Sequence, residues 1–145
     1  MDLLAPVSTI MTKKLFTVTP NDKLSLVKEI FDKHKIHHLP VVRYKTIVGM
    51  VSKTDLLYFL KGAAYDSGYE DMLNEARLSN YTVEEIMTKG LAKVSSKDRI
   101  GVAIEVFKVN LFHAIPVVDD DELVGILTTY DIIRSLSLKD QKVVK

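Results

Sequence analysis

Two stretches of this chain carry the same sequence pattern 76 positions apart. Residues 39–55 read LPVVRYKTIVGMVSKTD and residues 115–131 read IPVVDDDELVGILTTYD. Aligned without a gap, residues 7–60 and 83–136 are identical at 18 of 54 positions. This agreement indicates an internal duplication, and a repeat this short rarely buries its own apolar face. The chain is therefore expected to fold as a single module, residues 1–145, in which two similar repeats pack together.

Each copy predicts the same beginning, a short strand followed by a helix. LFTV at 15–18 and LAKV at 91–94 are partly apolar strand candidates. Thr19 to Asp22 and Ser95 to Asp98 then carry a helix-capping signature, a hydroxyl residue followed three positions later by an acid. The expected apolar face of these helices consists of Leu24, Val27, Ile30 and Phe31 in one copy, and Ile100, Ala103, Val106 and Phe107 in the other.

Each copy also predicts the same ending, a hairpin followed by a second helix. LPVV and IPVV are continuous apolar runs typical of buried strands, and the first helix must end before the proline. Polar turns, RYKT and DDDE, lead into IVGMVS and LVGILT. A second helix is expected from near Asp55 and Asp131. The acidic run 119–122 is interpreted as a solvated turn, because a calcium loop needs a longer ligand pattern with a glycine.

The remaining segments do not repeat. Residues 61–82 are expected to connect the copies through a loop, KGAAYDSG, and a short helix, YEDMLNEARLSN. The tail over 137–145 is expected to be frayed.

Composition excludes several classes of protein. Hydrophobic residues make up 47% and charged residues 27%, and the net charge of +1 argues against duplex nucleic acid as a partner. The absence of cysteine excludes disulfides, a thiolate nucleophile and Cys-ligated zinc. No apolar run approaches the roughly 18–20 residues that span a bilayer, and the N-terminus is a poor signal peptide. A cytoplasmic protein without a membrane partner is expected.

The doubled β-α-β-β-α unit, with its IMT opening, PVV strand and G-x-x-[ST]-x-x-D ending, resembles the CBS-domain pair, or Bateman module, of the stand-alone type. The resemblance implies an α+β fold in which the repeats pack about a pseudo-twofold axis, sheets facing and helices outside. It implies clefts that bind AMP, ADP, ATP or S-adenosylmethionine, and a homodimer that forms a disk of four repeats. The expected function is a regulatory sensor whose ligand changes its conformation for an effector protein. The alternative is a structural dimerisation module with vestigial clefts.

Two pairs of residues are the first candidates for binding, Ser52 with Asp55 and Thr128 with Asp131. A hydroxyl residue followed three positions later by an acid caps a helix N-terminus. A carboxylate can also accept both hydroxyls of a ribose, and a helix N-terminus favours a phosphate. The two roles do not exclude each other.

Histidines precede the PVV strands of both copies. His37 matches His113, and either imidazole could donate to a phosphate or serve as a structural histidine. At the next position His38 matches Ala114, so the two clefts are expected to differ. The resemblance implies that each cleft combines both copies. One set is Asp131, Thr128, Thr17, Ile36, His37 and His38, and the other is Asp55, Ser52, Lys93, Phe112 and His113.

Three further features carry weaker signals. Gly49 and Gly125 lie inside strands, where a ligand ring or an opposing sheet would equally explain them. His34 and His38 would share a helix face only if the helix continued, so a metal site is not expected. No nucleophile with a base and no acid pair at catalytic spacing is present, so an enzyme is not expected.

Overall fold

The computed structural model describes residues 1–61, 70–110 and 113–143. Its chain divides into two compact units, and each is described by itself. We call residues 16–90 the first-repeat unit, and residues 1–15 together with 91–145 the second-repeat unit. Each unit thus contains most of one sequence repeat and the opening IMT segment of the other.

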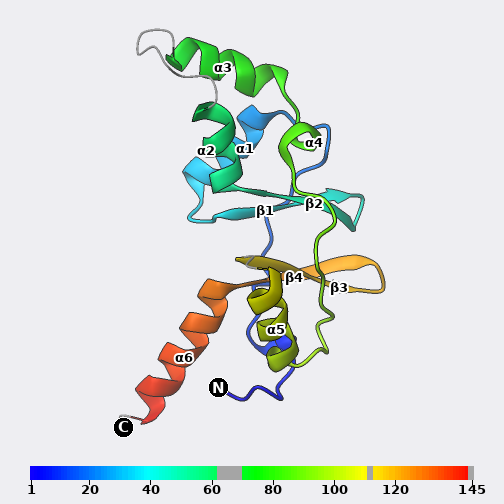
Figure 1. Ribbon diagram of the computed structural model, residues 1–145, viewed down its shortest axis with the longest axis vertical. Helices are drawn as coiled ribbons and strands as arrows, with labels where there is room; N and C mark the ends of the chain where they lie inside the picture. Colours follow the sequence, from blue (N-terminus) through cyan, green and yellow to red (C-terminus); the bar gives the residue numbers. More distant parts are fainter. Residues whose placement is uncertain (62–69, 111–112, 144–145) are drawn as a thin grey trace. The chain divides into compact units, whose positions relative to one another are not determined.

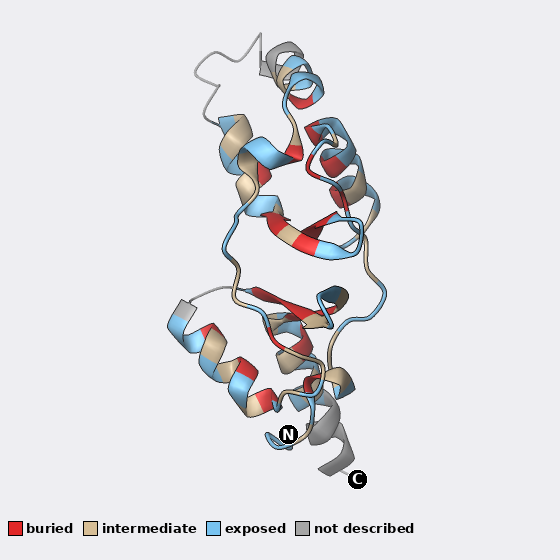
Figure 2. Ribbon diagram, turned by 90° about the vertical axis from the view of Figure 1, so that its right-hand side faces the viewer, coloured by how far each residue is buried: buried red, intermediate tan, exposed pale blue. Residues whose placement is uncertain are grey.

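The first-repeat unit is built around one antiparallel β-hairpin (Figure 1). Its elements in chain order are α1 (Leu24–Lys33), β1 (His38–Arg43), β2 (Thr46–Ser52), α2 (Lys53–Lys61), α3 (Glu70–Asn80) and α4 (Val83–Ile86). Helices α1 and α2 lie on the same side of the hairpin in both views of the molecule (Figures 1 and 2). The predicted hairpin, both predicted helices and the predicted connecting helix are confirmed. The predicted loop at 61–68 lies outside the described residues except for its first residue, Lys61.

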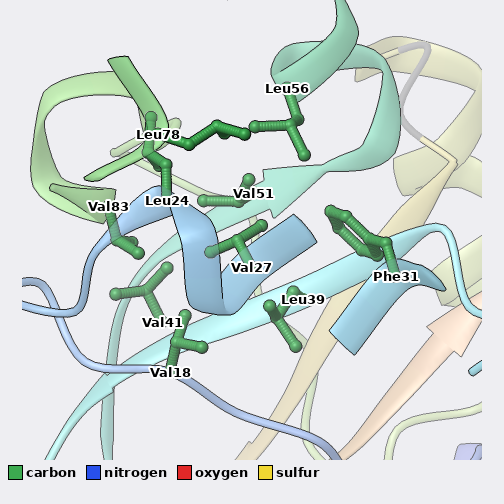
Figure 3. Packing of buried hydrophobic residues seen from close by; sticks show 10 residues of the cluster. All are labelled: Val18, Leu24, Val27, Phe31, Leu39, Val41, Val51, Leu56, Leu78 and Val83. Carbon is green, nitrogen blue, oxygen red and sulfur yellow. The ribbon is translucent and has the colours of Figure 1, made fainter. Parts of the chain in front are cut away.

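The core of this unit forms between the hairpin and the helices (Figure 3). Its buried side chains are Val18, Leu24, Val27, Phe31, Leu39, Val41, Val51, Leu56, Leu78 and Val83. The predicted apolar face of α1 is confirmed, since Leu24, Val27 and Phe31 are buried and Ile30 packs against them. The core therefore joins residues from every element of the unit.

The second-repeat unit contains a second antiparallel hairpin. Its elements are a short 3-10 helix (Val7–Thr9), α5 (Ile100–Asn110), β3 (Ala114–Asp119), β4 (Glu122–Thr128) and α6 (Thr129–Val143). Its core consists of Val7, Val94, Ala103, Phe107, Ile115, Val117 and Leu127. The two hairpins and their helices confirm the predicted α+β class.

The strands expected over 15–18 and 91–94 are not formed, and each segment makes a single parallel bridge. The Val18 N–H donates to the Pro40 carbonyl at 3.1 Å, and the Val42 N–H donates to the Val18 carbonyl at 2.8 Å. The next bond of such a ladder would need an N–H on Pro40, which proline lacks. The backbone pairing of Val94 is limited in the same way by Pro116. The proline that marks the buried strand thus stops its neighbour from pairing further.

The expected helix starts are also wrong by several residues. Helix α1 begins at Leu24 and α5 at Ile100, although the capping signatures begin at Thr19 and Ser95. In both copies the acid closes a local turn instead: the Thr19 N–H donates to Asp22 Oδ2 at 2.7 Å, and the Ser95 N–H donates to Asp98 Oδ2 at 2.8 Å. The same donor and acceptor that begin a helix can close a turn before it.

The tail expected to fray from residue 137 is helical instead, because α6 continues to Val143. No glycine or proline occurs between Thr129 and Val143, so nothing in the backbone ends the helix earlier. Residues 144–145 lie outside the described part of the chain.

The acidic turn at residues 119–122, which was expected to be solvated, is solvated only in part. Asp120 and Asp121 are exposed and adopt positive φ values of 50° and 63°, as a tight hairpin turn requires. Asp119, however, accepts hydrogen bonds from the Ser96 hydroxyl, the Ser96 N–H and the Ser95 hydroxyl. These bonds, led by that of the Ser96 hydroxyl, lower the pKa of Asp119 from its ordinary value. Asp119 therefore ties the turn before α5 to the end of β3.

We expect the stability contributed by Asp119 to disappear in acid. A carboxyl group whose pKa is lowered by folding stabilises the protein above its unfolded pKa of about 3.9, and this contribution is lost as the pH falls through the folded pKa. Asp119→Asn should therefore lower the urea midpoint between about pH 5 and 7. The difference from wild type should shrink below about pH 4. Asp120→Asn is the control, since Asp120 makes no side-chain hydrogen bond among the described residues. A pH-independent difference for Asp119→Asn would contradict the assignment.

Candidate functional site

Ser52 and Asp55 form a reciprocal capping box at the start of α2. The Asp55 N–H donates to Ser52 Oγ at 2.9 Å, and the Ser52 N–H donates to Asp55 Oδ2 at 3.0 Å. This arrangement satisfies donors that a helix N-terminus leaves unpaired. The carboxylate is half-buried, and Oδ1 accepts no hydrogen bond from the described residues.

Thr128 and Asp131 form the corresponding box at the start of α6, with more donors. The Asp131 N–H donates to Thr128 Oγ1 at 3.1 Å, while Asp131 Oδ2 accepts from the Thr128 N–H at 2.9 Å and the Thr128 hydroxyl at 3.0 Å. Asp131 Oδ1 accepts a further bond from the Thr12 hydroxyl at 2.9 Å. Asp131 is only 6% exposed, and it is the only buried charged side chain in the described chain.

The capping role predicted for both pairs is therefore confirmed. The two carboxylates differ in what remains available to a ligand. The Asp131 carboxylate accepts three hydrogen bonds from the described residues, whereas the Asp55 carboxylate accepts one. A carboxylate has about four lone-pair sites, so Asp55 retains more capacity to accept hydroxyl groups than Asp131 does.

The glycines inside the hairpins are explained by the IMT segments rather than by a ligand ring or an opposing sheet. In the first-repeat unit, Met50 and Thr88 exchange backbone hydrogen bonds of 3.0 and 2.9 Å, so the segment lies along β2. A Cβ on Gly49 would meet Met87 Sδ at 2.6 Å and the Thr88 carbonyl oxygen at 3.1 Å. The absence of a side chain allows this close approach of two backbones.

The second-repeat unit repeats this arrangement. Thr12 and Ile126 exchange backbone hydrogen bonds of 2.9 and 3.0 Å, and a Cβ on Gly125 would lie 2.7 Å from Met11 Sδ. Each IMT segment thus packs on the hairpin of the other sequence repeat.

The histidines that precede the strands lie beside the capping boxes. The Lys53 N–H donates to the His37 carbonyl at 2.8 Å, and His38 pairs with Ser52 across the hairpin. In the other unit the Thr129 N–H donates to the His113 carbonyl at 3.0 Å. These backbone contacts place His37 and His38 next to Ser52 and Asp55, and His113 next to Thr128 and Asp131. The side chains of His37 and His113 are exposed.

The other predicted site residues have the following positions. Thr17 and Lys93 are exposed and precede the single bridging residues, and Ile36 is half-buried before β1. Phe112 lies outside the described residues. The two predicted ligand-binding sets each combine residues of both units, and this combination stays a prediction.

Sequence reasoning missed one residue of the site, Thr12. Its hydroxyl reaches Asp131 across 119 positions of sequence. The available signal was the IMTK stretch that both copies share, which places Thr12 and Thr88 at matching positions. A contact between residues so far apart leaves no periodic pattern in the chain.

The histidines and helices of the described residues bear on two further expectations, a metal site and a membrane partner. His34 stacks on Phe16, with ring centroids 4.0 Å apart, and no cluster of three or more His, Asp or Glu residues there could hold a metal ion. None of the described helices combines the length and the hydropathy that crossing a membrane requires.

Comparison with known proteins shows similar sequences and similar folds. A family model described as CBS domain matches residues 7–62 and 83–138. The chain is 26% identical over 125 residues to an uncharacterised protein, MJ1225, of Methanocaldococcus jannaschii, and this match covers 86% of the chain and 44% of that protein. The matches cover 24% and 22% of two other curated relatives, so the chain spans less than half the length of these proteins.

Three solved structures match this chain along nearly their whole length. CBSX2, a CBS-pair protein from Arabidopsis thaliana, has a TM-score of 0.79 and 26% identity, covering 94% of this chain and 97% of that one. A CBSX2 structure in complex with AMP has a TM-score of 0.77 and 27% identity, covering 92% and 97%. The CBS domain pair of protein MJ0100, in complex with methylthioadenosine and S-adenosyl-L-methionine, has a TM-score of 0.74 and 26% identity, covering 90% and 98%. With two CBS domains matched over most of its residues, this chain belongs to the CBS-domain family.

Proposed function

We propose that this protein is a regulatory module that binds an adenosine compound, either AMP, ADP, ATP or S-adenosylmethionine. One observation carries the proposal: each unit presents an acid-closed capping box, in a chain similar to structures that hold AMP or S-adenosyl-L-methionine. These ligands share the adenosine moiety and differ beyond it. Carboxylates and helix N-termini that bind the shared adenosine moiety are compatible with each of these ligands.

Different residues are suited to different parts of such a ligand. Asp55 and Asp131 are suited to ribose, since a carboxylate accepts two hydroxyls at once. The N-termini of α2 and α6, with His37 and His113, are suited to a phosphate or a carboxylate. In the proposed sets Asp131 and Thr128 act with Thr17, Ile36, His37 and His38, and Asp55 and Ser52 act with Lys93, Phe112 and His113.

The proposed action is regulatory rather than catalytic. A ligand that binds one conformation more tightly shifts the population toward it, and an effector protein then responds to that conformation. Exposed apolar side chains on α2 and α6, among them Tyr58 at 81% and Ile133 at 63% exposure, fit contact with a second copy of the chain. The alternative is a homodimerisation module whose nucleotide sites no longer bind.

A thermal-shift titration tests the proposal. A ligand at 100 times its dissociation constant stabilises the native state by about 2.7 kcal/mol, or roughly 5–10 °C for a chain of this size. We expect such a shift with at least one of AMP, ADP, ATP and S-adenosylmethionine, and none with GTP. The double variant Asp55→Ala/Asp131→Ala should lose the shift.

The matched control is Asp22→Ala/Asp98→Ala. Each of these acids also accepts a local backbone hydrogen bond but belongs to neither proposed set, so the ligand response should persist. If no adenosine compound raises the melting temperature of the wild type, and the wild type elutes as a dimer in size-exclusion chromatography, the sensor function is wrong. The homodimerisation module is then favoured.

A further inference from the structure

The two capping boxes share their backbone geometry but differ in two hydroxyl contacts to the carboxylate, one from Thr12 to Asp131 Oδ1 and one from Thr128 to Asp131 Oδ2. Thr12 and Thr88 occupy matching positions, and each is anchored to the neighbouring strand by two backbone hydrogen bonds of about equal length. Of these two threonines, only Thr12 donates its hydroxyl to an acid, Asp131 Oδ1 at 2.9 Å. No corresponding bond joins Thr88 to Asp55 within the described residues.

We propose that the Thr12 hydroxyl occupies an acceptor site on the Asp131 carboxylate that a ligand would need. Asp55 is then the acid that binds the ribose hydroxyls. This inference rests on the proposed function. A cis-diol needs two acceptor sites on one carboxylate. Asp55 offers all of Oδ1 and part of Oδ2, because its one bond comes from the Ser52 N–H. At Asp131, Oδ2 already accepts two hydrogen bonds and Oδ1 accepts one from Thr12, so about one lone-pair site remains, too few for a diol until Thr12 is displaced.

Burial adds to this difference. Asp131 is 6% exposed, so a ligand would have to move protein groups to reach its carboxylate, whereas Asp55 is half-buried. A hydrogen bond to a charged group contributes enough that its displacement should weaken diol binding by about tenfold. The two sites should therefore differ in affinity by at least that factor where the remaining contacts are equal.

The difference does not come from the identity of the acid or of the threonine, because both copies carry the same residue at these positions. At Oδ1 it comes from the hydroxyl of Thr12, and at Oδ2 the Thr128 hydroxyl adds a bond that Ser52 does not make among the described residues. Replacing this residue by valine removes the hydroxyl, keeps the shape and leaves the box formed by Thr128 and Asp131 intact. Thr88→Val is the matched control, with the same substitution at the equivalent position.

Calorimetric titration with AMP and with 2′-deoxy-AMP gives the decisive comparison. In wild type we expect the tighter AMP binding to be weakened by loss of the 2′-hydroxyl and abolished by Asp55→Asn, but retained in Asp131→Asn. Thr12→Val should add a second AMP-binding event or tighten the weaker one by about tenfold, and Thr88→Val should do neither. Loss of the tighter event in Asp131→Asn but not in Asp55→Asn would overturn the inference. So would identical behaviour of the two valine variants.

A measurement without ligand separates this inference from the proposed function. Loss of the Thr12–Asp131 hydrogen bond should make Thr12→Val less stable in urea than Thr88→Val. If wild type binds no adenosine compound, the proposed function fails whatever the valine variants show. If binding occurs but the two valine variants have equal midpoints, the function stands and the role of Thr12 is wrong.

Discussion

Leu39→Ala is expected to lower the free energy of unfolding by about 2–5 kcal/mol, the usual cost of truncating a fully buried leucine. Leu39 is 0% exposed and lies in β1, within the core that joins α1, α2 and β2 (Figure 3). The substitution removes apolar contacts and leaves a cavity that the tightly packed surroundings fill only in part. Urea unfolding followed by circular dichroism measures the loss.

Leu57→Ala is the matched control for this prediction. Leu57 is 50% exposed on α2, so its truncation should change the free energy of unfolding by less than about 1 kcal/mol. Equal losses for the two leucines would show that the core is wrongly placed. Hydrogen exchange adds a second criterion, since Leu39→Ala should reduce protection first within the first-repeat unit, residues 16–90.

The sequence predicted those parts of the fold that depend on local periodicity. The apolar face of α1 and the continuous run at 39–42 each indicate an element and its buried side, and both are confirmed. The segments at 15–18 and 91–94 were predicted as strands from composition alone. Their pairing is limited by Pro40 and Pro116 on the adjacent strands, a constraint that acts between segments rather than within one.

The site was predictable to a similar extent. The two capping boxes lie within four consecutive residues each, so their geometry follows from the spacing of hydroxyl and acid. The Thr12–Asp131 bond joins segments far apart in the chain, and within the part that the structure describes the matching threonine, Thr88, makes no such bond. The sequence therefore predicts a capping box in each copy, and only the structure shows that a distant threonine bonds to the acid of one of them.

Gly49→Ala is expected to destabilise the first-repeat unit by about 1–3 kcal/mol, the usual range for an added group in a filled space. A Cβ at this position would lie 2.6 Å from Met87 Sδ and 3.0 Å from Met87 Cγ, with the Thr88 carbonyl oxygen 3.1 Å away. The methionine side chain can move, but the carbonyl is fixed by the backbone hydrogen bonds between Thr88 and Met50. The unfolding midpoint in urea measures the cost.

Gly101→Ala separates this steric effect from the general effect of replacing glycine. Gly101 lies in α5, and its nearest neighbour would be the Leu3 carbonyl oxygen at 3.4 Å, an ordinary contact. Because alanine is favoured over glycine in a helix by up to about 1 kcal/mol, this variant should be as stable as wild type or more stable. Glycine to alanine is thus expected to lower the free energy of unfolding at Gly49 and to leave it unchanged or raise it at Gly101. If Gly49→Ala were also neutral, the IMT segment could not lie against β2 as closely as its backbone bonds require. The glycine in each hairpin would then have to be explained by a ligand ring or an opposing sheet instead.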